Sequence, residues 1–428
     1  MTTKTVGKPR NIDEQTRRAK NGKIRASIAE TRSRRENQVK RTVDLKVVAN
    51  KLNRKQKEAL RRVFLEAKWI RNDCLAHGID GYEPGTTATV KLPDGTFEER
   101  ELTVIGSQMK QSVVSQLKSD RTSLSSSKKR GRKVGKLKFK SKVGSIDLKQ
   151  YGTTYAFKEK NNKRVHVQNV PGYVRIRGTD QIGENVAEFA NAKLVQRADG
   201  YHIIVTCCYW KDDIADEYQP GTLVGIDMGL KTAITLSDET EIEASVGETE
   251  RLKKLQKRKA KTKKGSSNRR RIQDEIDKQY LKMTYRKDDM ANKAVHLILK
   301  NETVFMQDEN IKGWKAKKGY VRGGRTVQKS ILGRVKTKLK AHPRVVVLPR
   351  HVATTATCPV CKHKTEHLPY KRTFECESCH HTAPRDRHGA CNMVRLGAPY
   401  VPAERGCLRA EALSDLTDEA ISALAAKH

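Results

Sequence analysis

The sequence has few aromatic residues, few acidic residues and no long apolar run. Aromatic side chains make up 5% of its 428 residues, and 49 acidic residues stand against 88 Lys and Arg. No stretch approaches the roughly 18 apolar residues that a membrane-spanning helix needs. The first residues are polar and basic, without the apolar segment of a secretory signal. We therefore expect neither a membrane span nor a secretory signal.

Cysteine is scarce and odd in number, with nine in the chain. An odd total suits a reducing compartment better than a disulfide framework. The sequence thus predicts a cytoplasmic protein, associated with the nucleoid if it binds nucleic acid.

The excess of basic residues gives a formal net charge of +39. Self-repulsion of this size is costly unless a polyanion neutralises it. Nucleic acid is such a polyanion, and counterion release from its phosphates would dominate the affinity. A packing protein and a very soluble basic enzyme share this property, so charge alone says nothing about catalysis.

The first half of the chain alternates between basic, helical and strand-like segments. Residues 1–40 have almost no large apolar residues, which favours a flexible basic arm, with a helix that forms only on RNA as the alternative. Strand-like alternation over residues 43–47 precedes a helical pattern that Asn53 could cap. The turn-rich residues 80–100 predict a hairpin or loop, and residues 107–124 predict a second helix.

Beyond these helices the apolar pattern changes twice. Short alternating runs over residues 163–210 predict antiparallel strands of a small sheet or barrel. Pro220-Gly221 marks a boundary, and residues 251–300 predict two long helices or a helical hairpin. A helical pattern near the C-terminus has no role that the sequence assigns.

Two basic segments are candidate nucleic-acid surfaces. The first precedes Tyr151, Tyr155 and Phe157, which suits phosphate pairing combined with base stacking. The second lies in the first predicted helix of residues 251–300. A solvated charged loop or helix is the alternative for each. The candidate contacts are Lys128, Lys129, Arg130, Arg132, Lys133, Lys136, Lys138, Lys254, Lys257 and Arg258.

Acidic residues follow or precede apolar segments at three places in the second half of the chain. Asp227 ends the apolar strand pattern that begins at Leu223, where a carboxylate is expensive unless a cation meets it. Asp308 and Glu309 follow a second apolar strand and point to opposite faces, so at most one can face a site with Asp227. Asp386 would lie at a helix start, above small residues that let the helix pack close to a sheet. The alternatives are a hairpin Asp, surface charges at a strand end and a helix-capping Asp.

Four cysteines form two CxxC pairs, Cys358/Cys361 and Cys376/Cys379. Each pair places two thiolates on one side of a Zn²⁺ ion, and two pairs complete a tetrahedral structural site. His363, His367, His380 and His381 lie nearby, but the cysteine set is already complete, so we expect them to be bystanders.

Taken in order, these motifs resemble TnpB proteins, the transposon-encoded RNA-guided nucleases, and the compact type V CRISPR effectors. GIDMGLKTAITLSD resembles their first acidic motif, QDENIKGW the second, and TTATC, the CxxC pairs and DRHGACN the third. The resemblance covers roughly residues 221–397. It is looser over VDLKVVANKLNRKQKEALRRVFLEAKWIRNDCL and KKRGRKVGKLKFKSK, and residues 1–40 and 399–428 lie outside it.

Two departures from the family pattern matter. Many members have Glu-Asp-Leu-Asn where this chain has Gln307-Asp308-Glu309-Asn310. Alignment on Asn-Ile-Lys-Gly places Gln307 at the catalytic Glu position, whereas alignment on Glu-Asn-Ile places Glu309 there. We favour Glu309, because the chemistry needs a carboxylate. Many members also have Asp-Arg-Asp where Pro384 replaces the first Asp, which leaves Asp386 at the catalytic position.

The resemblance implies an α/β plus β-rich architecture. A wedge β-barrel at 41–220 would carry a helical recognition insertion at about 53–125. An RNase-H-like (RuvC) nuclease domain would span 221–397 and include a zinc ribbon at about 355–383. A flexible basic arm would occupy residues 1–40, and a C-terminal tail would occupy residues 398–428.

The resemblance also implies a catalytic triad of Asp227, Glu309 and Asp386. The triad would hold two Mg²⁺ ions, with Mn²⁺ possible, and the four cysteines would hold one Zn²⁺. Guide RNA and target double-stranded DNA are the implied partners. The protein would act as a monomer or as a dimer on one RNA. A nuclease-dead RNA-guided repressor and a transposase that works without RNA remain open.

Overall fold

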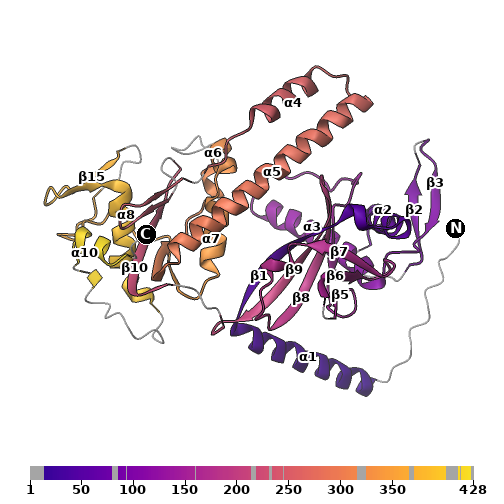
Figure 1. Ribbon diagram of the computed structural model, residues 1–428, viewed down its shortest axis with the longest axis horizontal. Coiled ribbons are helices and arrows are strands. Elements are labelled where there is room, and N and C mark those ends of the chain that lie inside the picture. Colours follow the sequence, from indigo (N-terminus) through magenta and orange to yellow (C-terminus); the bar gives the residue numbers. More distant parts are fainter. Residues whose placement is uncertain are drawn as a thin grey trace. The chain divides into compact units, whose positions relative to one another are not determined.

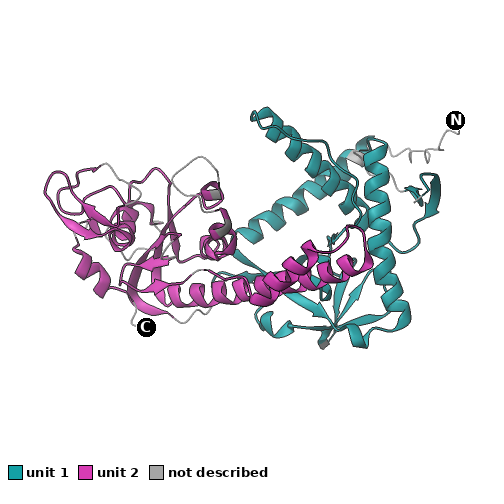
Figure 2. Ribbon diagram, turned by 90° about the horizontal axis from the view of Figure 1, so that it is seen from above, with its two compact units in different colours: residues 1–214 teal, residues 215–428 magenta. Residues whose placement is uncertain are grey.

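We describe a computed structural model of the chain, covering residues 14–79, 85–92, 94–159, 161–213, 218–230, 234–243, 245–315, 324–365, 371–401, 413–414 and 416–425. The chain forms two compact units, residues 1–214 and 215–428 (Figures 1 and 2). No helix in these ranges is long and apolar enough to cross a bilayer. His367 and Cys407 fall outside the described residues.

Unit 1 is built on a seven-stranded sheet with the order β4-β8-β9-β1-β7-β6-β5, antiparallel throughout its named pairings. The predicted strands of residues 43–47 and 163–210 are confirmed. Their alternation buries Leu45, Val165 and Ile203 in one core and leaves the intervening residues mainly polar. The strands are β1 (Gln38–Val47), β4 (Ser145–Leu148), β5 (Tyr155–Lys158), β6 (Asn161–Val167), β7 (Tyr173–Arg177), β8 (Glu188–Arg197) and β9 (Gly200–Trp210).

Two helices contribute Leu60, Phe64 and Met109 to the same core. The predicted Asn53 cap is confirmed, because its side chain accepts a hydrogen bond from the Gln56 N–H in a capping box. A separate hairpin occupies part of residues 80–100. These elements are α2 (Arg54–Ala76), α3 (Ser107–Lys129), β2 (Thr87–Lys91) and β3 (Phe97–Glu101).

The N-terminal segment differs from the flexible arm that its composition favoured. A helix, α1 (Glu14–Glu36), runs directly into β1 (Figure 1). Its last turn is held to β8 by ion pairs from Arg34 and Arg35 to Glu188. Low apolar content excludes a buried helix, but it does not exclude an exposed one that is tethered at its end.

Unit 2 contains a five-stranded sheet with the order β12-β11-β10-β13-β14. The strand β13 runs parallel to both β10 and β14, and β11 runs antiparallel to β10. The strands are β10 (Gln219–Met228), β11 (Ile234–Leu236), β12 (Glu241–Ile242), β13 (Asn301–Gln307) and β14 (Val345–Leu348).

The two faces of this sheet have separate cores. Val224, Ile226 and Met306 pack with α5 and α7, whereas Leu223 and Phe305 pack with α8. The predicted helical hairpin of residues 251–300 is confirmed as α4 and α5 (Figure 1), joined by a small apolar cluster that includes Leu255 and Ile276. The helices are α4 (Glu250–Ala260), α5 (Ser267–Ile298), α6 (Gly324–Lys329), α7 (Leu332–Lys340), α8 (Arg385–Gly397) and α10 (Asp418–Ala423).

Short elements complete both units. A two-stranded ribbon lies directly before α8, and single 3-10 turns connect longer elements in the described part of the chain. They are β15 (Thr373–Glu375), β16 (Thr382–Pro384), and the turns Ala49–Lys51, Thr179–Gln181, Gly313–Lys315 and Ala398–Tyr400.

Candidate active site and metal centre

The strand β10 places Asp227 on the sheet face that α8 covers. Gly225, two residues earlier, lies on the same face, and a Cβ there would lie 1.9 Å from the Ala390 carbonyl oxygen of α8. A Cβ on Gly389 would lie 3.4 Å from Cγ of Asp227. The first contact is too short for any side chain, so glycine at 225 lets helix and strand approach at main-chain distance, whereas the second is an ordinary van der Waals distance. This close contact brings the start of α8 beside the Asp227 carboxyl group.

The end of β13 carries the second acidic motif. In the parallel pairing of β10 with β13, Ile226 lies opposite Met306, so Gln307 takes the next position, beside Asp227. The buried Gln307 amide donates hydrogen bonds to the carbonyl oxygens of Pro349 (3.1 Å) and Val352 (2.6 Å). The register thus gives Gln307 the strand position beside Asp227 and leaves Glu309 just beyond the strand.

Asp308 and Glu309 have different surroundings. Asp308 forms ion pairs with Lys336 (2.6 Å), Lys340 (3.3 Å) and Arg350 (3.3 Å), and the hydrogen bond from Lys336 is the main reason that its pKa falls to about 2. Glu309 is partly buried, and this burial raises the pKa of its carboxyl group despite the nearby Lys336. Asp308 is thus held in several ion pairs, whereas Glu309 forms none with a described residue.

Asp386 lies in the first turn of α8. Its Oδ1 accepts hydrogen bonds from Arg385 at 2.7 and 2.9 Å, and Arg372 lies 3.5 Å from its Oδ2. The N-cap residue is Pro384, and no side chain caps the helix. Helix capping, the alternative that the sequence left open, is therefore not the role of Asp386.

The three acids are electrostatic neighbours. Burial raises the pKa of Asp227 to about 7, the charges of Asp386 and Glu309 add to this effect, and Arg385 opposes it. They are not gathered tightly. In the described part of the chain, only the four cysteines form a group of three or more potential ligands close enough to hold one ion.

The four cysteines form a compact cluster. All four sulfur atoms lie within 4.8 Å of one another, and Cys358–Cys379 and Cys361–Cys376 are each 3.5 Å apart. Lys362 and His380, the residues that follow the two CxxC pairs, both have φ of 59°. Matching turns therefore present both pairs to one centre, and four sulfur donors at this spacing fit one zinc ion.

The neighbouring histidines do not join this cluster. His363 and His381 accept hydrogen bonds from the Cys358 and Cys376 N–H groups through their backbone carbonyls, and no imidazole belongs to the group of potential ligands. Their assignment as bystanders agrees with this geometry for the described histidines.

Sequence reasoning missed the contact between the cysteine ribbon and α8. The buried His388 ring stacks on Phe374 of β15, with centroids 3.9 Å apart and planes 10° apart. Asn392, one turn later, donates hydrogen bonds to the Thr354 and Thr357 carbonyls at 2.8 Å. The spacing of His388 and Asn392 on one helix face is a signal that could have indicated these contacts.

The ten candidate nucleic-acid residues are divided between the two units. Those from Lys128 to Lys138 lie in unit 1, at the end of α3 and in the segment after it, and those from Lys254 to Arg258 lie on α4 of unit 2. All ten side chains are exposed, and none forms an ion pair with a described acidic residue. Each surface is free to meet a polyanion.

These features define an α/β unit with acidic residues in a central strand, just beyond its neighbour and at the start of a covering helix, together with a four-cysteine cluster. Two family models match mainly within this unit. OrfB_IS605, a probable transposase, matches residues 206–305, and the Cas12f1-like TNB domain matches residues 330–393. The first match contains Asp227, and the second contains the four cysteines and Asp386. Both matches support the resemblance to TnpB proteins and compact type V effectors that the order of the motifs indicated.

Solved structures give a weaker likeness. One of 27 matching chains comes from the "Cryo-EM structure of the Cas12f1-sgRNA-target DNA complex", at 13% identity. The alignment covers 83% of this chain and 99% of that chain, with a TM-score of 0.41. This score is too low to carry an argument, so the relationship depends on the family models. No curated protein matches the chain.

Proposed function

We propose that the chain is an RNA-guided DNA endonuclease. Unit 2 would be its RNase-H-like (RuvC) nuclease domain, and unit 1 its wedge domain, with α2 and α3 as the recognition insertion. The observation that carries the proposal is Asp227, a partly buried carboxyl group whose pKa is raised further by Asp386 and Glu309. Among the described residues no Lys or Arg forms an ion pair with Asp227, so a metal cation is the natural partner.

The donor set suits magnesium, because carboxylate oxygens are the hard ligands that Mg²⁺ and Mn²⁺ prefer. Asp227, Glu309 and Asp386 would together hold the two ions. When bound, two such ions activate a water molecule and stabilise the leaving 3′-oxygen of a phosphodiester. Arg385 orients the Asp386 carboxyl group, and Lys336 holds the Glu309 carbonyl oxygen at 2.6 Å.

The four cysteines would hold one structural zinc ion, and the stacking of Phe374 on His388 would transmit its rigidity to α8. Zinc would thus support the position of Asp386 without taking part in the reaction.

Guide RNA and target double-stranded DNA are the proposed partners. The Cas12f1-like family match and the TnpB relationship support this choice, and the exposed basic residues of α4 and of the segment after α3 suit phosphate contacts. The guide would supply sequence specificity by base pairing, while the protein recognises duplex shape and a short flanking DNA motif. Such a protein would work in the cytoplasm, on the nucleoid.

The test is cleavage of a plasmid library by the purified protein with its copurifying RNA and Mg²⁺. Asp227→Ala should abolish cleavage while RNA and DNA binding persist, because the side chain serves chemistry alone. Loss of binding with cleavage would contradict this role. Protein that cuts after all RNA is digested would favour the transposase alternative.

A nuclease-dead, RNA-guided repressor is a second candidate, favoured by one observation: Gln307 occupies the strand position beside Asp227. Two variants separate the candidates. If Glu309 supplies the carboxylate, Glu309→Gln abolishes cleavage and Gln307→Glu does not restore it. If Gln307 occupies the catalytic position, the natural chain binds target DNA without cutting it, and Gln307→Glu introduces cleavage.

A further inference from the structure

The helix α1 has a composition and an exposure that its contacts within unit 1 do not explain. Eight basic and three acidic residues lie between Glu14 and Glu36. None of its described side chains is buried, and even Ile24 and Ile28 are 49% and 63% exposed. Clustered like charges destabilise an isolated helix. A stable α1 therefore calls for a polyanionic neighbour.

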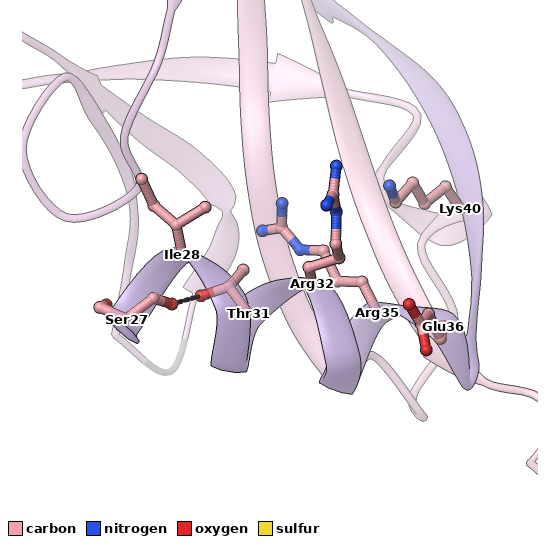
Figure 3. Close-up of a pocket in the computed structure, with 7 residues that line it drawn as sticks. All are labelled: Ser27, Ile28, Thr31, Arg32, Arg35, Glu36 and Lys40. Carbon is pink, nitrogen blue, oxygen red and sulfur yellow. Dashed lines mark hydrogen bonds between the residues drawn. The ribbon is translucent and has the colours of Figure 1, made fainter. Parts of the chain in front are cut away.

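A groove of about 550 Å³ lies between the last turns of α1 and the start of β1. In Figure 3 the side chains of Arg32, Arg35 and Lys40 extend into the same space from the helix and the strand. Arg35 is held by Glu188 at 2.6 Å, whereas Arg32 and Lys40 have no acidic partner among the described residues. Arg32 and Lys40 thus face the same groove, and the Arg35–Glu188 ion pair holds one side of that groove in place.

The other lining residues favour RNA over DNA. Glu36 places an exposed carboxylate in the same groove, which repels phosphate but accepts a hydrogen bond from a ribose 2′-hydroxyl, a group that DNA lacks. Ile28 offers an apolar surface for a sugar or base face. The Thr31 hydroxyl already donates to the Ser27 carbonyl at 2.8 Å, so it can only accept a further hydrogen bond.

We propose that the α1–β1 groove binds the sugar-phosphate backbone of RNA. Arg32 and Lys40 contact phosphates, and Glu36 accepts a ribose 2′-hydroxyl. The site lies outside the proposed nuclease site, and it depends on the proposed function only for the identification of that RNA as the guide.

The experiment measures binding of the full chain to an oligouridine RNA and to an oligodeoxyuridine DNA of equal length, over a series of salt concentrations. The double variant Arg32→Ala/Lys40→Ala should weaken RNA binding. It should also reduce the slope of log K against log salt by roughly 1.4, since each phosphate contact on a single strand contributes roughly 0.7. The control variant Lys23→Ala/Arg25→Ala removes the same charge from α1 outside the groove and should leave most of the slope intact.

Glu36→Ala tests the sugar contact. It should lower the ratio of RNA to DNA affinity, because it removes the acceptor and the repulsion of phosphate together. A photo-crosslinking residue at Ile28 should capture the RNA, whereas the same residue at Ala26 should not.

Equal loss of slope in the groove and control variants would overturn the proposal, since it would show that only net charge matters. An unchanged ratio in Glu36→Ala would contradict the choice of RNA. Asp227→Asn should bind oligouridine as the natural chain does, so failure of the nuclease proposal remains distinguishable from failure of this one.

Discussion

The two units each contain a carboxyl group withdrawn from water, and its pKa is displaced in opposite directions. In unit 1, burial alone would raise the pKa of the fully buried Glu66. A hydrogen bond from Arg62 at 2.8 Å and three from the backbone N–H groups of Thr103, Val104 and Ile105 outweigh burial and lower it. In unit 2, burial raises the pKa of Asp227 to about 7, and the nearest charged groups include two further acids.

This comparison separates a structural carboxylate from a functional candidate. Glu66 is fully satisfied by its own protein and joins α2 to the start of α3. Asp227 is left without an ion pair among the described residues, which is costly in a protein that has no use for it. The Asp44–His202–Asp199 network of unit 1 is likewise satisfied by its own protein, because Arg197 pairs with Asp44 and Lys46 with Asp199.

Loss of the metal from the cysteine cluster should have the largest effect. The ribbon has a minimal core of Cys358, Phe374 and Cys376, so bound zinc would supply most of its folding free energy, on the order of 10 kcal/mol. Cys376→Ser should abolish zinc binding and expose the ribbon to proteases. The measurements are metal content and limited proteolysis. His363→Ala, a matched change in the same ribbon, should retain one zinc ion per chain, and a metal-free natural chain with a protected ribbon would contradict the assignment.

Glu66→Ala should destabilise unit 1, because it removes the carboxylate whose hydrogen bonds are satisfied. It leaves Arg62 and three backbone N–H groups without their acceptor, which should cost about 3–5 kcal/mol of unfolding free energy. Chemical denaturation followed by tryptophan fluorescence suits this test, since the Arg62 guanidinium lies 4.8 Å from the Trp69 ring centroid. Glu58→Ala on the exposed face of α2 should change stability by less than about 0.5 kcal/mol.

Magnesium should distinguish Asp227 from its satisfied neighbours. At about one hundred times the dissociation constant, Mg²⁺ should stabilise the natural chain by about 2.7 kcal/mol in calorimetry. Asp227→Asn should lose this gain, because the central ligand is absent. Asp308→Asn should keep it, because Lys336, Lys340 and Arg350 already neutralise Asp308. An identical magnesium response in both variants would remove Asp227 from the metal site.

The smallest effect should come from acid titration of unit 1. Burial would raise the pKa of Asp44, but the hydrogen bond from His202 and the charge of Arg197 outweigh it and lower the pKa below 3.8. A lowered pKa contributes stability above about pH 4, which is lost as the pH falls through the folded-state value. Asp44→Asn should reduce the fall in melting temperature between neutral and acid pH. Asp212→Asn, an exposed change elsewhere in unit 1, should leave that fall as it is in the natural chain.

Much of the fold was predictable, because its signals are local. Alternation indicated β1 and the strands of residues 163–210, the Asn53 cap indicated the start of α2, and helical spacing indicated the α4–α5 hairpin. The flexible arm that composition favoured over the helical alternative was wrong for residues 14–36, since composition registers a lack of apolar residues and not a tether such as the Glu188 ion pairs.

The candidate site was predictable only in part, because it depends on contacts between distant residues. The cysteine spacing predicted one cluster directly. The roles of Asp227, Glu309 and Asp386 as metal ligands stay predictions. The choice between Gln307 and Glu309 could not be made from spacing, and strand register is what places Gln307 beside Asp227. The stacking of Phe374 on His388 joins residues whose proximity no local pattern reveals.

Gly225 in β10 has a consequence for which substitutions this protein can accept. With the Ala390 carbonyl oxygen 1.9 Å from where a Cβ would lie, the separation between the strand and α8 is set by the backbone alone. Mutational drift can therefore exchange the acids and switch any chemistry on or off while the frame stays intact. A single methyl group at position 225 would instead push α8 away from β10 while every charge is preserved. This position therefore controls the spacing of the acidic residues independently of their identity.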